Sequence, residues 1–367
     1  MFTFVRIAAI ILGFVLIFGI LRDAFETIIL PRRVTRRIRL TSFFYASFWK
    51  PWSFVGRRIE KPRSREAYLS VFGPLSLLIL LVIWTFGLIL GYSLWLWAAD
   101  LPLNVSGDFG TYLYLSGVTF FTLGYGDITP TGALGRILAV IEAGNGFGVF
   151  AIVISYLPTL YQAFSNREAS ISLLDARAGS PSSAVELLRR HRAEDKLYDL
   201  DRLLDEWERW SAELLESHLS YPVLCYFRSQ HDNQSWLRAL TTVLDTCALV
   251  MVGVEGGPIW QARMTFAMAR HAVVDIAQVL KTSPVPPEAC SVRLPSEELV
   301  RVRQILKQNG ILFPVDEKAE QRLGDLRTMY EPYVFALSEW LMMPLPPWIL
   351  PADAIDNWKT SAWGRLQ

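Results

Sequence analysis

Three long apolar segments restrict this chain more than any other feature of its sequence. Residues 2–21, 71–98 and 133–160 are each long enough to cross a bilayer as a helix, which takes about 20 apolar residues. In lipid every backbone polar group needs a partner within the protein, so spans of this length are expected to be helical. Apolar residues make up 52% of the chain and the mean hydropathy is +0.28. We predict an all-α, partly membrane-embedded protein.

The first apolar segment has two interpretations. Residues 2–21 contain one charged residue, Arg6, and Arg22-Asp23 follows them directly. A cleaved signal peptide would have a basic start, a shorter apolar region and a small-residue cleavage site. Because no Ala-x-Ala pattern precedes the charged residues, we predict a transmembrane helix over residues 1–22.

A glycine-rich run lies between the second and third apolar segments. Residues 119–130 read Thr-Phe-Phe-Thr-Leu-Gly-Tyr-Gly-Asp-Ile-Thr-Pro. A strand whose carbonyls all point the same way must adopt left-handed backbone angles at intervals, and glycine does so at little steric cost. Gly124 and Gly126 fit that requirement, and Thr122 adds a hydroxyl oxygen. Taken alone, Gly-Tyr-Gly-Asp is also compatible with a tight surface turn.

This run resembles the selectivity filter of potassium channels, in which rings of backbone carbonyls replace the water shell of the ion. The six matching residues are Thr122, Leu123, Gly124, Tyr125, Gly126 and Asp127. The order of outer helix, pore helix (Thr111–Phe121), filter and inner helix within residues 69–162 also matches simple bacterial-type channels of this family. The resemblance implies K+ held by Thr122–Tyr125 as the permeant ion, with no cofactor. It also implies a homotetramer, because one loop supplies a quarter of each oxygen ring.

The resemblance also assigns gating and pore-lining positions on the inner helix, which is predicted from Ala133 to about Gln162. These positions are Glu142, Gly146, Phe147, Phe150, Ile154 and Pro158. Gly146 falls at the usual hinge position, and the alternative is close helix packing through Gly144 and Gly148. Pro158 lacks a backbone donor, so a kink is expected near the cytoplasmic end.

Two polar positions depart from the simple pattern. An ionisable side chain in a transmembrane helix costs about 2.5–3.5 kcal/mol on insertion scales, so Glu142 should face protein or water. It either forms a hydrogen bond behind the filter, supporting Asp127 or the pore helix, or faces the cavity and attracts cations; a neutral glutamate between helices is also compatible. At Val118 some related channels carry a glutamate paired with the filter aspartate. Without it, Asp127 needs another partner, and we expect the Tyr114 hydroxyl.

Basic residues set the predicted topology. Twelve Lys and Arg residues lie between Arg22 and Arg65, and only Arg6 precedes the first span. The excess of positive charge marks the cytoplasmic side, so we predict the N-terminus outside the cell and a plasma-membrane location. Aromatic residues between 43 and 54 indicate contact with membrane lipid, either as an anchor and connector or as a gating slide helix. Pro51 and Pro62 predict only short helices there.

The C-terminal region reads as a helical cytoplasmic domain. Ser183 and Glu186 form a capping-box pattern, and Leu197, Leu200, Leu204, Trp207 and Leu214 recur at helical spacing, which favours a bundle core over a short coiled coil. Further helices are expected near 234–252, 259–281, 296–309 and 316–341. The isolated histidines and Cys225, Cys247 and Cys290 form no metal-ligand or CxxC pattern, so buried, reduced thiols are expected.

We therefore predict four regions: an N-terminal helix at 1–22, a basic interfacial linker at 23–68, a pore domain with a re-entrant loop at 69–164 and a regulatory domain at 165–367. The predicted function is passive K+ conduction, gated by the C-terminal domain, whose ligand is unknown. We expect neither an enzyme nor a nucleic-acid partner. The alternatives are a less selective cation channel, since Leu123 replaces the common valine, and a membrane-anchored sensor or enzyme with a vestigial pore.

Overall fold

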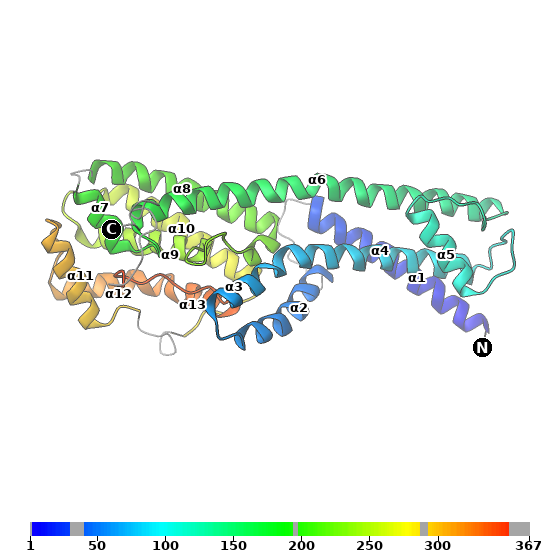
Figure 1. The fold of residues 1–367 in the computed structure, drawn as a ribbon, viewed down its shortest axis with the longest axis horizontal. Helices are drawn as coiled ribbons and strands as arrows, with labels where there is room; N and C mark the ends of the chain where they lie inside the picture. The colour runs from blue at the N-terminus through cyan, green and yellow to red at the C-terminus, as the bar shows by residue number, and fades with distance from the viewer. Residues whose placement is uncertain (1, 30–39, 194–196, 287–292, 352–367) are drawn as a thin grey trace, which may run out of the picture. The chain divides into compact units, whose positions relative to one another are not determined.

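The computed structural model describes residues 2–29, 40–193, 197–286 and 293–351 (Figure 1). Within these residues all named elements are helices, which confirms the all-α prediction. The chain forms two compact units, one made of Met1–Val55 with Val71–Gln162 and the other of Gly56–Ser70 with Ala163–Gln367. We call them the membrane unit and the C-terminal unit. Residues 23–68, predicted as one linker, are thus shared between both units, and the arginines at 32–39 lie outside the described residues.

The first apolar segment is a helix of the membrane unit. Helix α1 (Phe2–Ala24), continued by the π-helical turn η1 (Phe25–Ile29), packs along α4 (Phe72–Ala98). The Trp95 indole donates to the Ile10 carbonyl at 3.0 Å. At the same end, the Arg6 guanidinium lies 3.2 Å from the Asp100 carboxylate. Close helix packing therefore joins the first span to the outer pore helix.

Helix α2 (Leu40–Arg57) corrects the prediction of short pieces, because it runs through Pro51 without a break. Its inward face buries Phe44, Tyr45 and Trp49. The rings of Trp49 and Phe72 meet at 4.8 Å between centroids. Burial of these aromatic rings outweighs the one backbone hydrogen bond that proline removes.

Helix α6 (Ala133–Ala178) also extends beyond its prediction, which placed the end near Gln162. It contains Pro158 and passes the polar change at Ser165 without interruption. Ile171 and Leu174, on the added turns, are each 1% exposed within the C-terminal unit. The extra helix is stabilised by apolar burial that the local sequence, being mixed and polar, did not reveal.

The C-terminal unit is a helical bundle. It contains α3 (Pro62–Ser70), the end of α6, α7 (Ala184–Ala193), α8 (Leu197–Ser220), the 3-10 helix η2 (Pro222–Tyr226), α9 (Trp236–Gly253) and α10 (Ile259–Val279), followed by α11 (Ser296–Gln308), α12 (Glu317–Thr328) and α13 (Glu331–Leu341). Helix α10 packs against both α8 and α9. Leu200, Leu204, Trp207 and Leu214 of α8 are buried, which confirms the bundle-core interpretation.

Two predicted local features differ in detail. The helix expected at 316–341 is two helices, because Tyr330 is buried and Pro332 favours a new helix start. The capping pattern forms only in part: the Ser183 hydroxyl accepts from the Glu186 amide at 3.4 Å, while the Glu186 carboxylate binds Arg189 and Arg190 instead of returning to Ser183.

Among the residues that the structure describes, four helices are long and apolar enough to cross a membrane: Thr3–Ile29, Pro62–Ala98, Ala133–Ala178 and Trp236–Gly253. The last of these is α9, and 83% of its apolar window is buried inside the protein, against 17–44% for the other three. Its apolar surface is thus already covered by other helices of the C-terminal unit. We interpret α9 as a core helix and the other three as the membrane spans.

Candidate ion-conduction site

The re-entrant helix begins with a side-chain cap. Helix α5 (Phe109–Phe120) starts two residues earlier than predicted because the Asp108 carboxylate accepts from the Thr111 amide at 3.1 Å. At its other end the Leu123 amide donates to the Val118 carbonyl at 2.9 Å. This turn leads directly from α5 into the filter run.

The backbone of the predicted filter, residues 122–127, alternates between left-handed and ordinary conformations. The φ angles are 56° at Thr122, 60° at Gly124 and 78° at Gly126, whereas Leu123 and Tyr125 have negative φ. Such alternation is what a strand with carbonyls on one side requires. The sequence indicated the two glycines but not Thr122, where a left-handed angle costs on the order of 1–3 kcal/mol.

The end of the predicted filter at Asp127 is held by two residues from other segments. The Tyr114 hydroxyl donates to the Asp127 carboxylate at 3.0 Å, which confirms the expected pairing. The Asn104 amide donates to the Asp127 carbonyl at 2.9 Å and accepts from the Thr129 amide at 2.8 Å. The sequence did not predict a role for Asn104, because its side chain forms hydrogen bonds with a segment 25 residues away. No local sequence pattern indicates such a contact.

Glu142 is buried inside the membrane unit, between α6 and α5. It is 1% exposed and forms a hydrogen bond with Ser116 of α5, while no bond joins it to Asp127 in the described part of the chain. One turn along α6, the Asn145 amide donates to the Tyr92 hydroxyl of α4. The Glu142 side chain therefore forms a hydrogen bond with α5, as in the first placement that the sequence allowed, and does not face a cavity. The prediction that the Glu142 side chain lines a pore is therefore corrected, because its burial between helices removes it from water.

Gly146 packs against the end of α5. A Cβ atom there would lie 2.1 Å from the Phe120 carbonyl oxygen, whereas Gly144 and Gly148 have no neighbour within 4 Å of theirs. Close packing within the chain therefore occurs at Gly146, the predicted hinge, and not at the glycine pair considered as the alternative. The contact is between backbones, so only glycine fits without a shift.

The predicted pore-lining side chains divide into two groups. Phe147 and Ile154 are each 71% exposed on the single chain. Phe150 lies against the end of α5, with its ring 6.3 Å from that of Phe120 and 6.0 Å from that of Phe121. Phe147 and Ile154, two turns apart, therefore form an uncovered stripe, and Phe150 packs against the end of α5.

A buried arginine anchors the end of α6 in the C-terminal unit. Arg167 donates to the carbonyls of Leu224 and Phe227, each at 3.0 Å, and lies 3.3 Å from His218 Nε2. Burial, together with the neighbouring Arg167 charge, lowers the pKa of His218 well below its usual range. Burial raises the pKa of the Cys225 thiol to about 12, so this thiol is unreactive. Cys225 and Cys247 are buried and free as expected, and Cys290 lies outside the described residues.

The residue directly after Phe227, Arg228, binds Glu66 of α3. Arg228, with 6% of its side chain exposed, lies 3.4 Å from the Glu66 carboxylate and donates to the carbonyls of Leu341 and Met342. The loop from Leu224 to Arg228 thus contacts both the α6 extension and α3.

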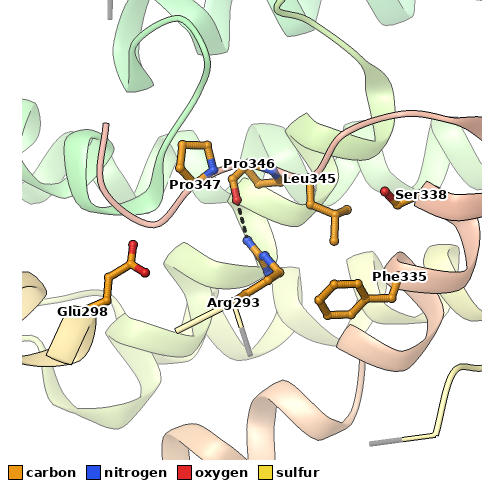
Figure 2. Close-up of a pocket in the computed structure, with 7 residues that line it drawn as sticks. All are labelled: Arg293, Glu298, Phe335, Ser338, Leu345, Pro346 and Pro347. Atoms are coloured by element: carbon orange, nitrogen blue, oxygen red, sulfur yellow. Dashed lines mark hydrogen bonds between the residues drawn. The ribbon is translucent and has the colours of Figure 1, made fainter. Parts of the chain in front are cut away.

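A pocket of about 400 Å³ opens in the C-terminal unit (Figure 2). Its lining residues are Arg293, Glu298, Phe335, Ser338, Leu345, Pro346 and Pro347. The Arg293 guanidinium donates to the Pro346 carbonyl at 2.9 Å and to the Asp245 carboxylate at 2.7 Å, and Glu331 lies 3.3 Å away. Its charge is already balanced by two carboxylates, so this wall offers little attraction to an anionic ligand.

Residues 78–163 match the family described as "Ion channel". They include most of α4, all of α5, the filter run and the part of α6 that belongs to the membrane unit. The match and the apolar helices together define an ion-channel domain in a multi-pass membrane protein.

Two proteins with similar sequences have names that state no activity. "Uncharacterized membrane protein YdjJ" of Bacillus subtilis (strain 168) is 24% identical over 213 residues, which cover 55% of this chain and 60% of that protein. "Protein LctB" of Geobacillus stearothermophilus is 46% identical over 43 residues, 12% of this chain and 31% of its own. The chain thus spans less than two thirds of each of these relatives. No solved structure matches.

Proposed function

We propose that this protein is a potassium-selective channel that conducts K+ passively through a pore formed by four copies of the chain. The observation that carries the proposal is the alternation of left-handed angles at Thr122, Gly124 and Gly126 directly after a re-entrant helix. Successive carbonyls on one side of the strand give each ion a ladder of oxygens in place of water. Four copies are required because one strand supplies a quarter of each ring.

The exposed side chains of the single chain support the assembly. Leu123 and Tyr125 of the filter are 54% and 68% exposed, and the stripe of Phe147 and Ile154 is uncovered. Contacts between copies would bury the filter side chains behind the ion path, with Phe147 and Ile154 lining the cavity below. The Asp127 ring would receive ions at the outer mouth.

The proposed orientation places the N-terminus and the filter mouth outside the cell and the C-terminal unit in the cytoplasm. The basic residues between Arg22 and Arg65 favour this orientation. The ion pair of Arg6 with Asp100 agrees, because it joins the start of α1 to the loop that precedes α5. The C-terminal unit would bias opening through α6, which runs through both units.

The test is cation flux into liposomes that contain the purified full chain. We expect K+ flux that greatly exceeds Na+ flux and that is abolished by Gly124→Ala, because alanine is strained at a φ of 60°. Gly144→Ala is the matched control, since its Cβ meets no atom within 4 Å. Equal K+ and Na+ flux would favour the less selective cation channel. No flux from the intact chain would reject the channel and favour the membrane-anchored sensor.

A further inference from the structure

The inference concerns a serine hydroxyl that has two partners and one hydrogen. Ser116 of α5 is fully buried and Glu142 of α6 is 1% exposed. Ser116 Oγ lies 2.8 Å from the carbonyl oxygen of Ile89 in α4, a normal distance for an O–H···O hydrogen bond. The same Oγ forms a short hydrogen bond with a carboxyl oxygen of Glu142. Three helices therefore meet at one hydroxyl group.

The number of hydrogens available at Ser116 determines the protonation state of the Glu142 carboxyl group. A serine hydroxyl carries one hydrogen, and a backbone carbonyl can only accept. The Ser116 hydrogen satisfies the Ile89 carbonyl, so the second contact needs a hydrogen from Glu142. We propose that Glu142 is a neutral carboxylic acid that donates to Ser116, and that loss of this proton at alkaline pH weakens K+ conduction.

The ionised alternative fits the contacts poorly. If the Ser116 hydrogen pointed to a Glu142 carboxylate, the Ser116 and Ile89 oxygens would face each other at 2.8 Å with no hydrogen between them. The carboxylate would also be buried with a single hydroxyl donor, and a charge at such depth costs about 2.5–3.5 kcal/mol on insertion scales. Both penalties disappear when the carboxyl keeps its proton.

The surroundings offer no compensating positive charge. Among the neighbouring helices, α5 presents Ser116 and α4 presents Tyr92, whose hydroxyl already accepts from Asn145 of α6. In the described part of the chain no Lys, Arg or His forms an ion pair or a hydrogen bond with Glu142. Among the described residues Ser116 is the side chain that forms a hydrogen bond with Glu142, so a negative charge here would have no cationic partner.

The hydrogen-bonded chain from Glu142 through Ser116 to Ile89 acts on the filter through α5. Ser116 lies one turn before Phe120, the last residue of α5, and Thr122 follows two residues later. Deprotonation would turn the Ser116 hydrogen toward the carboxylate and leave the Ile89 carbonyl without its hydroxyl partner. Helix α5 would lose its polar link to α4, so the filter above it would lose support. This step rests on the proposed channel function; the protonated state of Glu142 does not.

A second buried acid in the same unit serves as a control. Asp23 accepts from the Thr41 hydroxyl at 2.6 Å, the Thr41 amide at 3.3 Å and the Trp84 indole at 3.1 Å. Each of these three contacts supplies a hydrogen to Asp23, whereas Glu142 meets one hydroxyl whose hydrogen goes to Ile89. Asp23→Asn therefore removes a buried acid from the same unit without touching the Glu142 contacts.

The first experiment is infrared spectroscopy of the full chain in liposomes. We expect the spectrum of the parent protein at neutral pH to contain a protonated-carboxyl C=O band that Glu142→Gln removes and Asp23→Asn leaves in place. The band should also disappear reversibly at alkaline pH. A parent spectrum without a band that Glu142→Gln removes would overturn the protonated state, whether or not the protein conducts ions.

The second experiment is K+ flux against pH in the same liposomes. Glutamine keeps a hydrogen to donate to Ser116, so Glu142→Gln should conduct at neutral pH and lose the alkaline decline seen in the parent. Asp23→Asn should keep that decline. Equal alkaline decline in the parent and Glu142→Gln would overturn control by this proton. Absence of K+ flux in the parent would reject the proposed function, and the infrared result would still decide the state of Glu142.

Discussion

The contact of Gly146 with the end of α5 gives the sharpest quantitative prediction. In Gly146→Ala the new Cβ would lie 2.1 Å from the Phe120 carbonyl oxygen and 3.0 Å from its carbon, where real Cβ atoms essentially never approach closer than 3.0 Å. Helices α5 and α6 would have to separate by about 0.9 Å, the difference between 3.0 and 2.1 Å. No rotamer change relieves this clash, because both partners are fixed by helical backbone.

The expected cost follows from two opposing effects. Forcing an extra carbon into a packed site costs about 1–3 kcal/mol, and a backbone contact belongs at the upper end of that range. Alanine recovers about 1 kcal/mol of helix propensity relative to glycine. We therefore expect Gly146→Ala to lower the free energy of unfolding by about 2 kcal/mol. Gly144→Ala and Gly148→Ala gain the propensity without a clash within the chain, so they should be neutral or stabilising.

The assay is denaturant unfolding of the full chain in detergent, paired with the K+ to Na+ flux ratio in liposomes. Because Phe120 lies two residues before Thr122, Gly146→Ala should also reduce the flux ratio. Unchanged stability and an unchanged flux ratio in Gly146→Ala would refute the packing argument. Unchanged stability with altered opening alone would instead favour a pure hinge at Gly146.

Three further predictions concern hydrogen bonds and charge. Tyr114→Phe removes the hydroxyl that binds Asp127, so K+ flux should fall by up to about fivefold, the equivalent of about 1 kcal/mol, without loss of fold. Arg228→Gln leaves a partly buried carboxylate and two carbonyls without their arginine partner, so hydrogen exchange should show the C-terminal unit destabilised by about 1–3 kcal/mol. His218 has a lowered pKa when folded, so below about pH 6.5 the unfolded chain binds a proton that the folded chain does not. The free energy of unfolding should therefore fall as pH drops below about 6.5, by at most about 1.4 kcal/mol per pH unit. His218→Gln should lack this part of the pH dependence. An equal dependence in both proteins would show that the buried environment of His218 is not responsible.

The sequence predicted those features whose causes are local. Helical spans follow from runs of apolar residues, and the left-handed angles at Gly124 and Gly126 follow from the glycines of a six-residue pattern. The partner of Asp127 was also predictable, since a missing carboxyl at Val118 left Tyr114 as the next donor along α5. In each case the residues that determine the geometry lie within about four turns of one another in the sequence.

Features that depend on distant partners were not predictable. Helix α6 runs to Ala178 because Ile171 and Leu174 are covered by the C-terminal unit, and α2 passes Pro51 because aromatic rings from another helix cover it. Asn104 reaches a segment 25 residues away. In all three, burial or hydrogen bonds supplied by residues far along the chain outweigh the local preference for a break or a turn.

The two buried acids of the membrane unit show the same limit at the level of chemistry. Hydropathy treats Asp23 and Glu142 alike, as charges to be avoided in an apolar segment. Their hydrogen-bond partners separate them: Asp23 faces three donors, whereas Glu142 faces one hydroxyl that is already donating to Ile89. An environment of donors favours a carboxylate and an environment short of hydrogens favours a carboxylic acid, because each form satisfies its neighbours. The charge of a buried acid is therefore fixed by which donors the fold brings to it, and that depends on helix packing that residue type alone does not specify.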